Sequence, residues 1–122
     1  MIHSYKDLEV WKRAMTLTEE VYEITASFPT EEKYGLTSQI RRSALSIPSN
    51  IAEGRYRFGK KDFVRFLRYS YSSGAELGTQ IELSKRLAAT RKLDYSKVDE
   101  LLEEVMKMLN VMINKLIPRT YH

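Results

Sequence analysis

The chain has 122 residues and a mass of 14.3 kDa, which is enough for one domain with a single core. Hydrophobic residues make up 43% and charged residues 30%, a globular composition that excludes a disordered tail protein, and no apolar run reaches the roughly 18–20 residues of a membrane span. The net charge of +4 is ordinary for a small domain, and the absence of cysteine excludes disulfides, thiolate metal sites and cysteine nucleophiles.

The first predicted element is a helix over residues 6–27, because apolar residues recur there every three or four positions. The main stripe consists of Val10, Ala14, Leu17, Val21, Ile24 and Phe28. A second stripe consists of Leu8, Trp11, Met15, Thr18 and Tyr22. Pro29 is expected to stop this helix.

The second predicted helix covers residues 34–54 and contains an internal proline, Pro48. Either the helix kinks at Pro48, or it breaks and restarts with Asn50 as its cap and Glu53 at capping-box spacing. We favour a kinked, continuous helix because the apolar spacing carries on to Ile51. In it, Asn50 is expected to satisfy the carbonyl that Pro48 leaves without a donor, and Gly54 to form the C-terminal cap.

The last two predicted helices cover residues 60–88 and 96–117. The apolar and small residues of the third helix are Phe63, Leu67, Ser70, Gly74, Leu77, Ile81 and Ser84. The core face of the fourth is predicted to be Val98, Leu102, Val105, Leu109, Met112 and Leu116. Three further apolar residues lie outside that line, namely Met106, Met108 and Ile113.

These patterns predict an all-α fold: a single domain over residues 1–122, built as an antiparallel up-down-up-down four-helix bundle. A bundle needs one apolar face per helix, whereas the first and fourth helices carry more. The surplus apolar surface predicts a homo-oligomer. The N-terminal segment lacks the apolar core of a signal peptide, so we expect a cytoplasmic protein without membrane attachment.

The sequence offers little for catalysis. Its two histidines, His3 and His122, lie near opposite ends of the chain, and no glutamate has a histidine three residues later, as a bundle di-metal site requires. No phosphate-binding glycine-rich loop is present. We therefore expect no enzyme activity, metal, cofactor or small-molecule substrate. Glu53 is expected to pair with an arginine or to cap a backbone N–H, with a hydrolase centred on Glu53 as the competing hypothesis.

The positive charge is concentrated in one segment. Residues 55–92 carry ten basic and three acidic side chains, a net charge of +7, while the segments before and after it are slightly negative. Aromatic residues interleave with the basic ones, a combination that suits base stacking and phosphate contact. These aromatics are Tyr56, Phe58, Tyr69 and Tyr71. The competing interpretation is a solvated helix face with the aromatics turned into the core.

Several motifs in the chain resemble one known family. They are Asp7-Leu8-Glu9-Val10-Trp11, Phe28-Pro29, Tyr34 to Ala44, Ser46-Ile47-Pro48-Ser49-Asn50-Ile51-Ala52-Glu53-Gly54, Phe66-Leu67 and Ser72 to Leu77. Together they are similar to the four-helix-bundle proteins encoded in intervening sequences of bacterial 23S rRNA genes. The resemblance implies a left-handed bundle without enzyme activity that assembles as a homopentamer around a central channel.

Relatives in that family include accessory proteins of diversity-generating retroelements, which are basic pentamers that bind nucleic acid and a reverse transcriptase. Here the charge is modest and confined to one segment, which disfavours a reverse-transcriptase partner. Two hypotheses follow: a protein that binds RNA or DNA with little sequence preference, or a protein-interaction scaffold whose arginines serve subunit contacts. The residues predicted to bind phosphates are Arg41, Arg42, Arg55, Arg57, Lys60, Lys61, Arg65 and Arg68.

Overall fold

The computed structural model describes residues 4–117, in which all regular structure is helical. The four α-helices are α1 (Glu9–Thr25), α2 (Leu36–Arg55), α3 (Lys60–Arg86) and α4 (Ser96–Leu116). Two single 3₁₀ turns, η1 (Tyr5–Asp7) and η2 (Thr30–Glu32), precede α1 and α2. The predicted all-α, four-helix fold is therefore confirmed. Both histidines lie outside the described residues.

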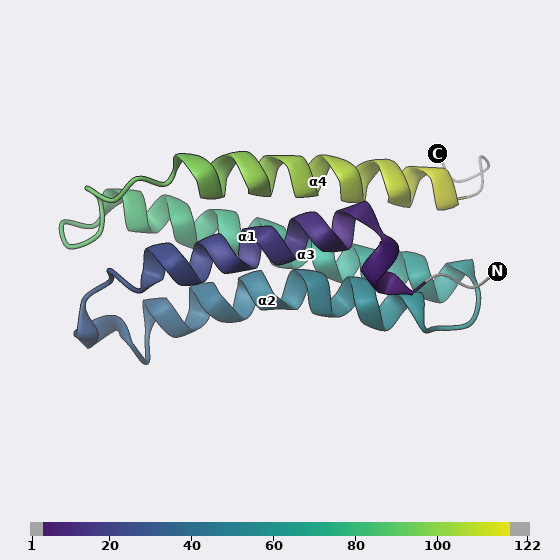
Figure 1. The fold of residues 1–122 in the computed structure, drawn as a ribbon, viewed down its shortest axis with the longest axis horizontal. Coiled ribbons are helices and arrows are strands. Elements are labelled where there is room, and N and C mark those ends of the chain that lie inside the picture. Colours follow the sequence, from purple (N-terminus) through teal and green to yellow (C-terminus); the bar gives the residue numbers. More distant parts are fainter. Residues whose placement is uncertain (1–3, 118–122) are drawn as a thin grey trace.

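The helices lie side by side along the long axis of the molecule (Figure 1). α1 and α3 each pack against both α2 and α4, whereas within residues 4–117 neither the α1–α3 pair nor the α2–α4 pair packs together. The α1–α2 and α3–α4 connections lie at one end of the bundle. The α2–α3 connection lies at the other end, together with the last turn of α4 (Figure 1). None of the four helices is long and apolar enough to cross a bilayer.

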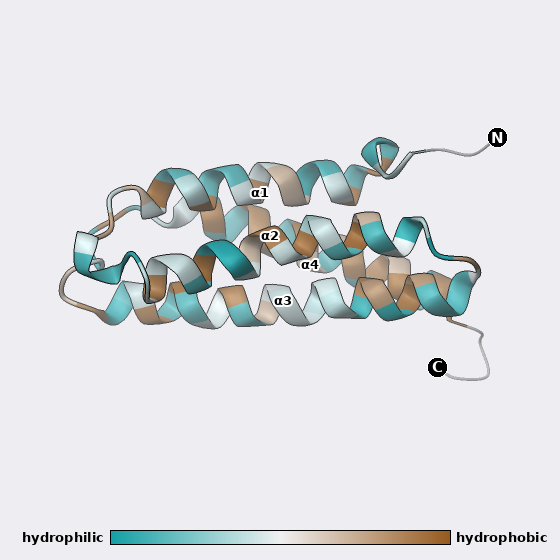
Figure 2. Cartoon of the chain, turned by 90° about the horizontal axis from the view of Figure 1, so that it is seen from below, coloured by the Kyte–Doolittle hydropathy of each residue, from teal (hydrophilic) through white to brown (hydrophobic). Residues whose placement is uncertain are grey.

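The core is formed by one apolar stripe from each helix, and hydrophobic and hydrophilic stretches alternate along each ribbon accordingly (Figure 2). In α3 the predicted residues from Leu67 to Ser84 are buried, together with Val64 and Phe66. The predicted face of α4 was wrong in part. Its buried residues are Val98, Leu101, Val105, Leu109 and Ile113, while Leu102, Met112 and Leu116 are only partly buried. The apolar surface of α4 is wide enough for either line, and only its packing against α1 and α3 selects one.

Helix α2 runs without interruption through Pro48, so the predicted continuity is confirmed and the alternative of a break before Asn50 is wrong. Proline has no N–H, so the carbonyl of Ala44, four residues earlier, loses its helical donor. The hydroxyl of Thr18 on α1 supplies a replacement, with its Oγ1 3.2 Å from the Ala44 oxygen. The expected role of Asn50 was therefore wrong: its Nδ2 donates to the Ser46 carbonyl at 2.9 Å and lies 3.0 Å from Ser46 Oγ.

The expectation that Gly54 caps α2 was also wrong. Gly54 is buried inside the helix, which continues to Arg55, and the one positive φ in residues 4–117 belongs to Gly59, at +85°. At Gly54 the backbone of α2 lies close to α3, because a Cβ there would lie 2.6 Å from Phe66 Cβ. The α2–α3 contact is also bridged by polar groups, with Ser70 Oγ donating to the Ile47 carbonyl at 2.8 Å.

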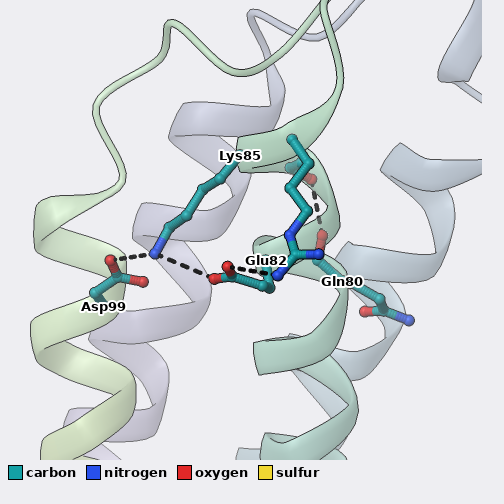
Figure 3. A network of polar contacts seen from close by, with 6 residues as sticks. Gln80, Glu82, Lys85 and Asp99 are labelled. Carbon is teal, nitrogen blue, oxygen red and sulfur yellow. Dashed lines mark hydrogen bonds and ion pairs between the residues drawn. The ribbon is translucent and has the colours of Figure 1, made fainter.

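A polar network joins α3 to α4 at the opposite end (Figure 3). Lys85 Nζ lies 2.7 Å from Asp99 Oδ2 and 3.9 Å from Glu82 Oε2. The hydrogen bond to Asp99 raises the pKa of Lys85, while partial desolvation acts in the other direction. The buried Tyr95 hydroxyl donates to the Thr90 carbonyl at 2.8 Å in the same connection.

Candidate nucleic-acid interface

A groove of about 1290 Å³ lies between the first turns of α3 and the end of α4. Half of its ten lining residues within residues 4–117 are basic. The lining residues are Lys60, Lys61, Asp62, Val64, Arg65, Arg68, Tyr69, Lys115, Leu116 and Ile117. With five cations and one carboxylate, this basic groove is a concave positive surface.

Most of the cations in the basic groove are free. Lys60, Lys61, Arg68 and Lys115 are exposed, and within residues 4–117 none of these four forms an ion pair. Arg65 is the exception, because its Nη2 lies 3.2 Å from Asp62 Oδ1. Lys61, Arg65 and Arg68 recur at helical spacing and therefore form a ridge along α3. Four unneutralised charges beside a hollow leave a strong field for an anion.

Two of the predicted arginines are held against one aromatic ring. The guanidinium carbons of Arg57 and Arg65 lie 4.8 Å and 5.1 Å from the centroid of the buried Phe66 ring. Arg57 also pairs with Glu53, at 3.1 Å between Nη2 and Oε1. Glu53 thus lies in a half-exposed ion pair that joins the end of α2 to the α2–α3 connection. These contacts fix the orientation of both guanidinium groups but leave each about half exposed.

Four of the eight predicted residues do not line the basic groove, namely Arg57 and the three arginines of α2. Arg41 faces α1, where its Nε donates to Thr25 Oγ1 at 2.8 Å and its guanidinium lies over the Tyr22 ring. Arg42 is exposed, but both residues lie about 20 Å along α2 from Arg55, at 1.5 Å per residue. Arg55 is half-buried at the groove end of α2, and its Nε is buried without a hydrogen-bond partner.

The aromatic side chains interleaved with this segment point outward. Tyr56, Phe58, Tyr69 and Tyr71 are all exposed, with Phe58 98% exposed in the α2–α3 connection. The competing interpretation was therefore wrong in turning these aromatics into the core, while its other part, a solvated helix face, stays a prediction. Phe63 and Phe66 supply the inward-facing rings of this segment instead.

The scaffold hypothesis predicts that the arginines pair with acidic residues such as Glu19, Glu20, Glu23, Glu103 and Glu104. Within residues 4–117, three of these pair with other cations and two form no ion pair. Glu104 pairs with Arg13 at 3.0 Å, Glu20 with Lys97 at 3.2 Å and Glu103 with Lys107 at 3.1 Å. None of these three cations is among the eight residues predicted to bind phosphates. Within the described part of the chain, Arg65 is therefore the one cation of the basic groove that an acidic side chain neutralises.

Sequence reasoning missed one cation of the basic groove, Lys115 in the last turn of α4. Lys115 is 47 positions after Arg68, and only the packing of α4 against α3 brings it to the same hollow. A basic residue in the last turn of a helix is common because it complements the helix dipole, so the sequence carried no specific signal.

Two comparisons with known proteins bear on this chain. The sequence model of the family described as 23S rRNA-intervening sequence protein matches residues 6–111. That range contains α1, α2 and α3 entirely and most of α4. A comparison with curated proteins gives no match. Within residues 4–117, no cluster of histidine, aspartate and glutamate side chains is arranged to hold a metal ion.

Proposed function

The chain belongs to the 23S rRNA-intervening sequence protein family, and from this premise we propose that it is a non-enzymatic, homo-oligomeric bundle that binds RNA or DNA. The phosphate backbone is the proposed ligand, and the basic groove is the proposed site. The observation that carries this proposal is a set of four cations around one hollow that form no ion pair with the described part of the chain, namely Lys60, Lys61, Arg68 and Lys115.

The chemistry of the basic groove suits a polyanion rather than a small metabolite. Lysine and arginine neutralise phosphates and release condensed counterions, which drives binding without regard to sequence. Phosphate contacts fix orientation but do not read bases. Among the described residues, the lining contains no asparagine or glutamine for bidentate contact with adenine. We therefore propose little sequence preference.

Self-association would multiply these contacts. A second, apolar hollow of about 360 Å³ lies between the start of α1 and the end of α4, beside the half-exposed Val111. This surface supports the proposed homo-oligomer, for which the family resemblance implies five subunits. The alternating ends of the helix connections support an antiparallel, up-down-up-down order within each subunit (Figure 1). A ring would present several copies of a weak site and raise the overall affinity.

A protein-interaction scaffold is the second candidate function, and the same apolar hollow favours it. In that case the hollow would hold a different protein, and the basic groove would stay solvated. We place a reverse-transcriptase partner below both candidates because the positive charge is confined to one segment. A cytoplasmic location without a membrane partner completes the proposal.

Fluorescence anisotropy of a labelled structured RNA and a labelled DNA, titrated from low to physiological salt, tests the proposal. The decisive variant is Lys61→Glu with Arg68→Glu, two unpaired cations on the same ridge. The matched control is Arg91→Glu with Lys92→Glu, which changes the net charge equally at two exposed positions in the α3–α4 connection.

We expect binding whose logarithm falls linearly with the logarithm of salt, at about 0.7–0.9 per phosphate contacted. The groove variant should abolish binding at physiological salt, and the control should retain most of it. Equal losses of affinity in both variants would mean that binding depends on the net charge of the protein and not on the basic groove. Absence of binding at low salt would reject the proposal and leave the scaffold as the leading function.

A further inference from the structure

The α2–α3 connection carries two exposed aromatic rings at the end of the bundle. Phe58 is 98% exposed, the most exposed large apolar side chain within residues 4–117, and Tyr56 is 71% exposed. Exposing a whole phenylalanine forgoes a large apolar burial. Isolated exposed apolar residues are common, so the neighbourhood of the ring decides its meaning.

Cations surround Phe58 in the chain. Arg57 precedes it, and Lys60 and Lys61 follow after a single glycine. Both lysines line the basic groove, so the ring stands at the same end of the bundle as the proposed phosphate site. Gly59 adopts a φ of +85°, which reverses the chain immediately after Phe58 and before α3 begins. A Cβ at Gly59 would meet nothing within 4 Å, so the connection around it is open.

The neighbouring Tyr56 is held in place rather than loose. Its ring lies 5.7 Å from the ring of Tyr5, which in turn lies 5.2 Å from Trp11, both pairs in edge-to-face geometry. This row of rings ties the start of the connection to η1 and α1. Because Tyr56 is held against Tyr5, the connection before Phe58 is already ordered, and Phe58 would lose less conformational entropy when a ligand binds.

We propose that Phe58 is a stacking platform for an unpaired base, so that the protein selects single-stranded or looped nucleic acid over duplex. This inference rests on the proposed function. Cations beside an exposed ring form the arrangement that binds single strands, in which phosphates follow a basic groove and bases stack on aromatic faces. A fully paired duplex buries its base faces in its own stack, except the outer faces of its two terminal base pairs.

An anionic membrane also attracts exposed aromatics beside lysines. The structure favours nucleic acid over a membrane for two reasons. The cations line a concave groove, which fits a narrow polyanion better than a flat surface does. A membrane-surface element presents a broad apolar face, whereas Phe58 is a single ring beside charged and hydroxyl-bearing neighbours.

The test compares a 12-nucleotide single-stranded RNA with its blunt duplex, using wild-type protein, Phe58→Ala and Phe58→Trp. Tyr34→Ala is the matched control, because Tyr34 is 88% exposed beside a lysine in the α1–α2 connection. A 2-aminopurine base in the single strand reports stacking directly through loss of its fluorescence. Circular dichroism confirms that each variant is folded.

We expect wild type to prefer the single strand and Phe58→Ala to lose about 5- to 100-fold in affinity for it, with duplex affinity unchanged. Phe58→Trp should retain binding and 2-aminopurine quenching, and Tyr34→Ala should resemble wild type. Unchanged single-strand affinity in Phe58→Ala, while Lys61→Glu with Arg68→Glu still abolishes binding, would overturn the stacking role and leave the proposed function intact. Binding to phosphatidylserine vesicles that depends on Phe58, without RNA binding by wild type, would overturn both in favour of a membrane.

Discussion

The hydroxyl of Thr18 on α1 donates a hydrogen bond to the Ala44 carbonyl of α2, which has no backbone N–H donor because residue 48 is proline. Its Oγ1 lies 3.2 Å from that oxygen and 2.8 Å from the Ala14 carbonyl on its own helix. Both oxygens share one hydroxyl donor, and the site is buried. We therefore expect the contributions of Pro48 and Thr18 to the free energy of unfolding to be coupled.

A double-mutant cycle measures this coupling. Thr18→Val should lower the free energy of unfolding by about 1–3 kcal/mol, because it leaves the buried Ala44 carbonyl without a side-chain donor. In a Pro48→Ala background the same change should cost about 1 kcal/mol less, since residue 48 then has an N–H for that carbonyl. Urea unfolding at one fixed protein concentration gives the free energies of unfolding of wild type, the two single variants and the double variant. Equal costs in both backgrounds would refute the coupling.

Three glycines make a graded series of alanine substitutions. Gly54→Ala should lower the free energy of unfolding by about 1–3 kcal/mol, because the new Cβ meets the Cβ of Phe66. That Cβ is attached directly to the backbone, so it can give way only if α3 shifts. Gly74→Ala should cost less, because the atoms in its way belong to the flexible end of Met106. Gly78→Ala should stabilise by about 0.5–1 kcal/mol through helix propensity, since its nearest neighbour is Leu102 Cδ2 at 3.5 Å. Melting temperatures in any other order would contradict this packing.

The Lys85–Asp99 contact predicts an alkaline loss of stability. Because the folded pKa of Lys85 is raised above its ordinary 10.5, the contact stabilises the fold below that pH. The contribution of this contact to stability is lost as the pH rises through the pKa of Lys85 in the folded protein. Lys85→Met should cost about 0.2–1 kcal/mol at pH 8, as for a partly exposed ion pair, and less at pH 11. A difference from wild type that stays constant between the two pH values would show that Lys85 acts by packing.

Two arginines near the basic groove should respond differently to neutralisation. Arg68→Gln should lower the salt slope of RNA binding by about 0.7–0.9, the value for one phosphate contact, because Arg68 forms no ion pair within residues 4–117. Arg57→Gln should change the slope less, because Glu53 already balances that charge at 3.1 Å. Anisotropy titrations over the same salt series give both slopes. A larger change for Arg57 would place the phosphate path over the α2–α3 connection instead.

Periodicity was sufficient for most of the fold. The three-to-four spacing predicted four helices, and the continuation of that spacing to Ile51 predicted an unbroken α2 despite Pro48. It was insufficient for α4, where Ile113 is buried and Leu102 is not fully buried. A helix that is apolar over a wide face has no single best line, so its neighbours set its rotation.

The candidate site was predictable only within its own segment. Lys61, Arg65 and Arg68 lie on one ridge because helical spacing is local. Local spacing carries no information about Lys115, which reaches the basic groove from another helix, or about Arg41, which packs onto Tyr22 instead.

The sequence by itself determined the helical class, the number of helices, the family and the segment that holds the positive charge. All of these depend on composition or on neighbours within a few residues along the chain. Only the tertiary structure decided that Thr18 serves Ala44, that Gly54 admits Phe66, and that Lys115 joins the basic groove. These are contacts between residues on different helices, and they depend on how far each helix is shifted and rotated against the next. Packing sets that shift and rotation, and periodicity along one helix leaves them open.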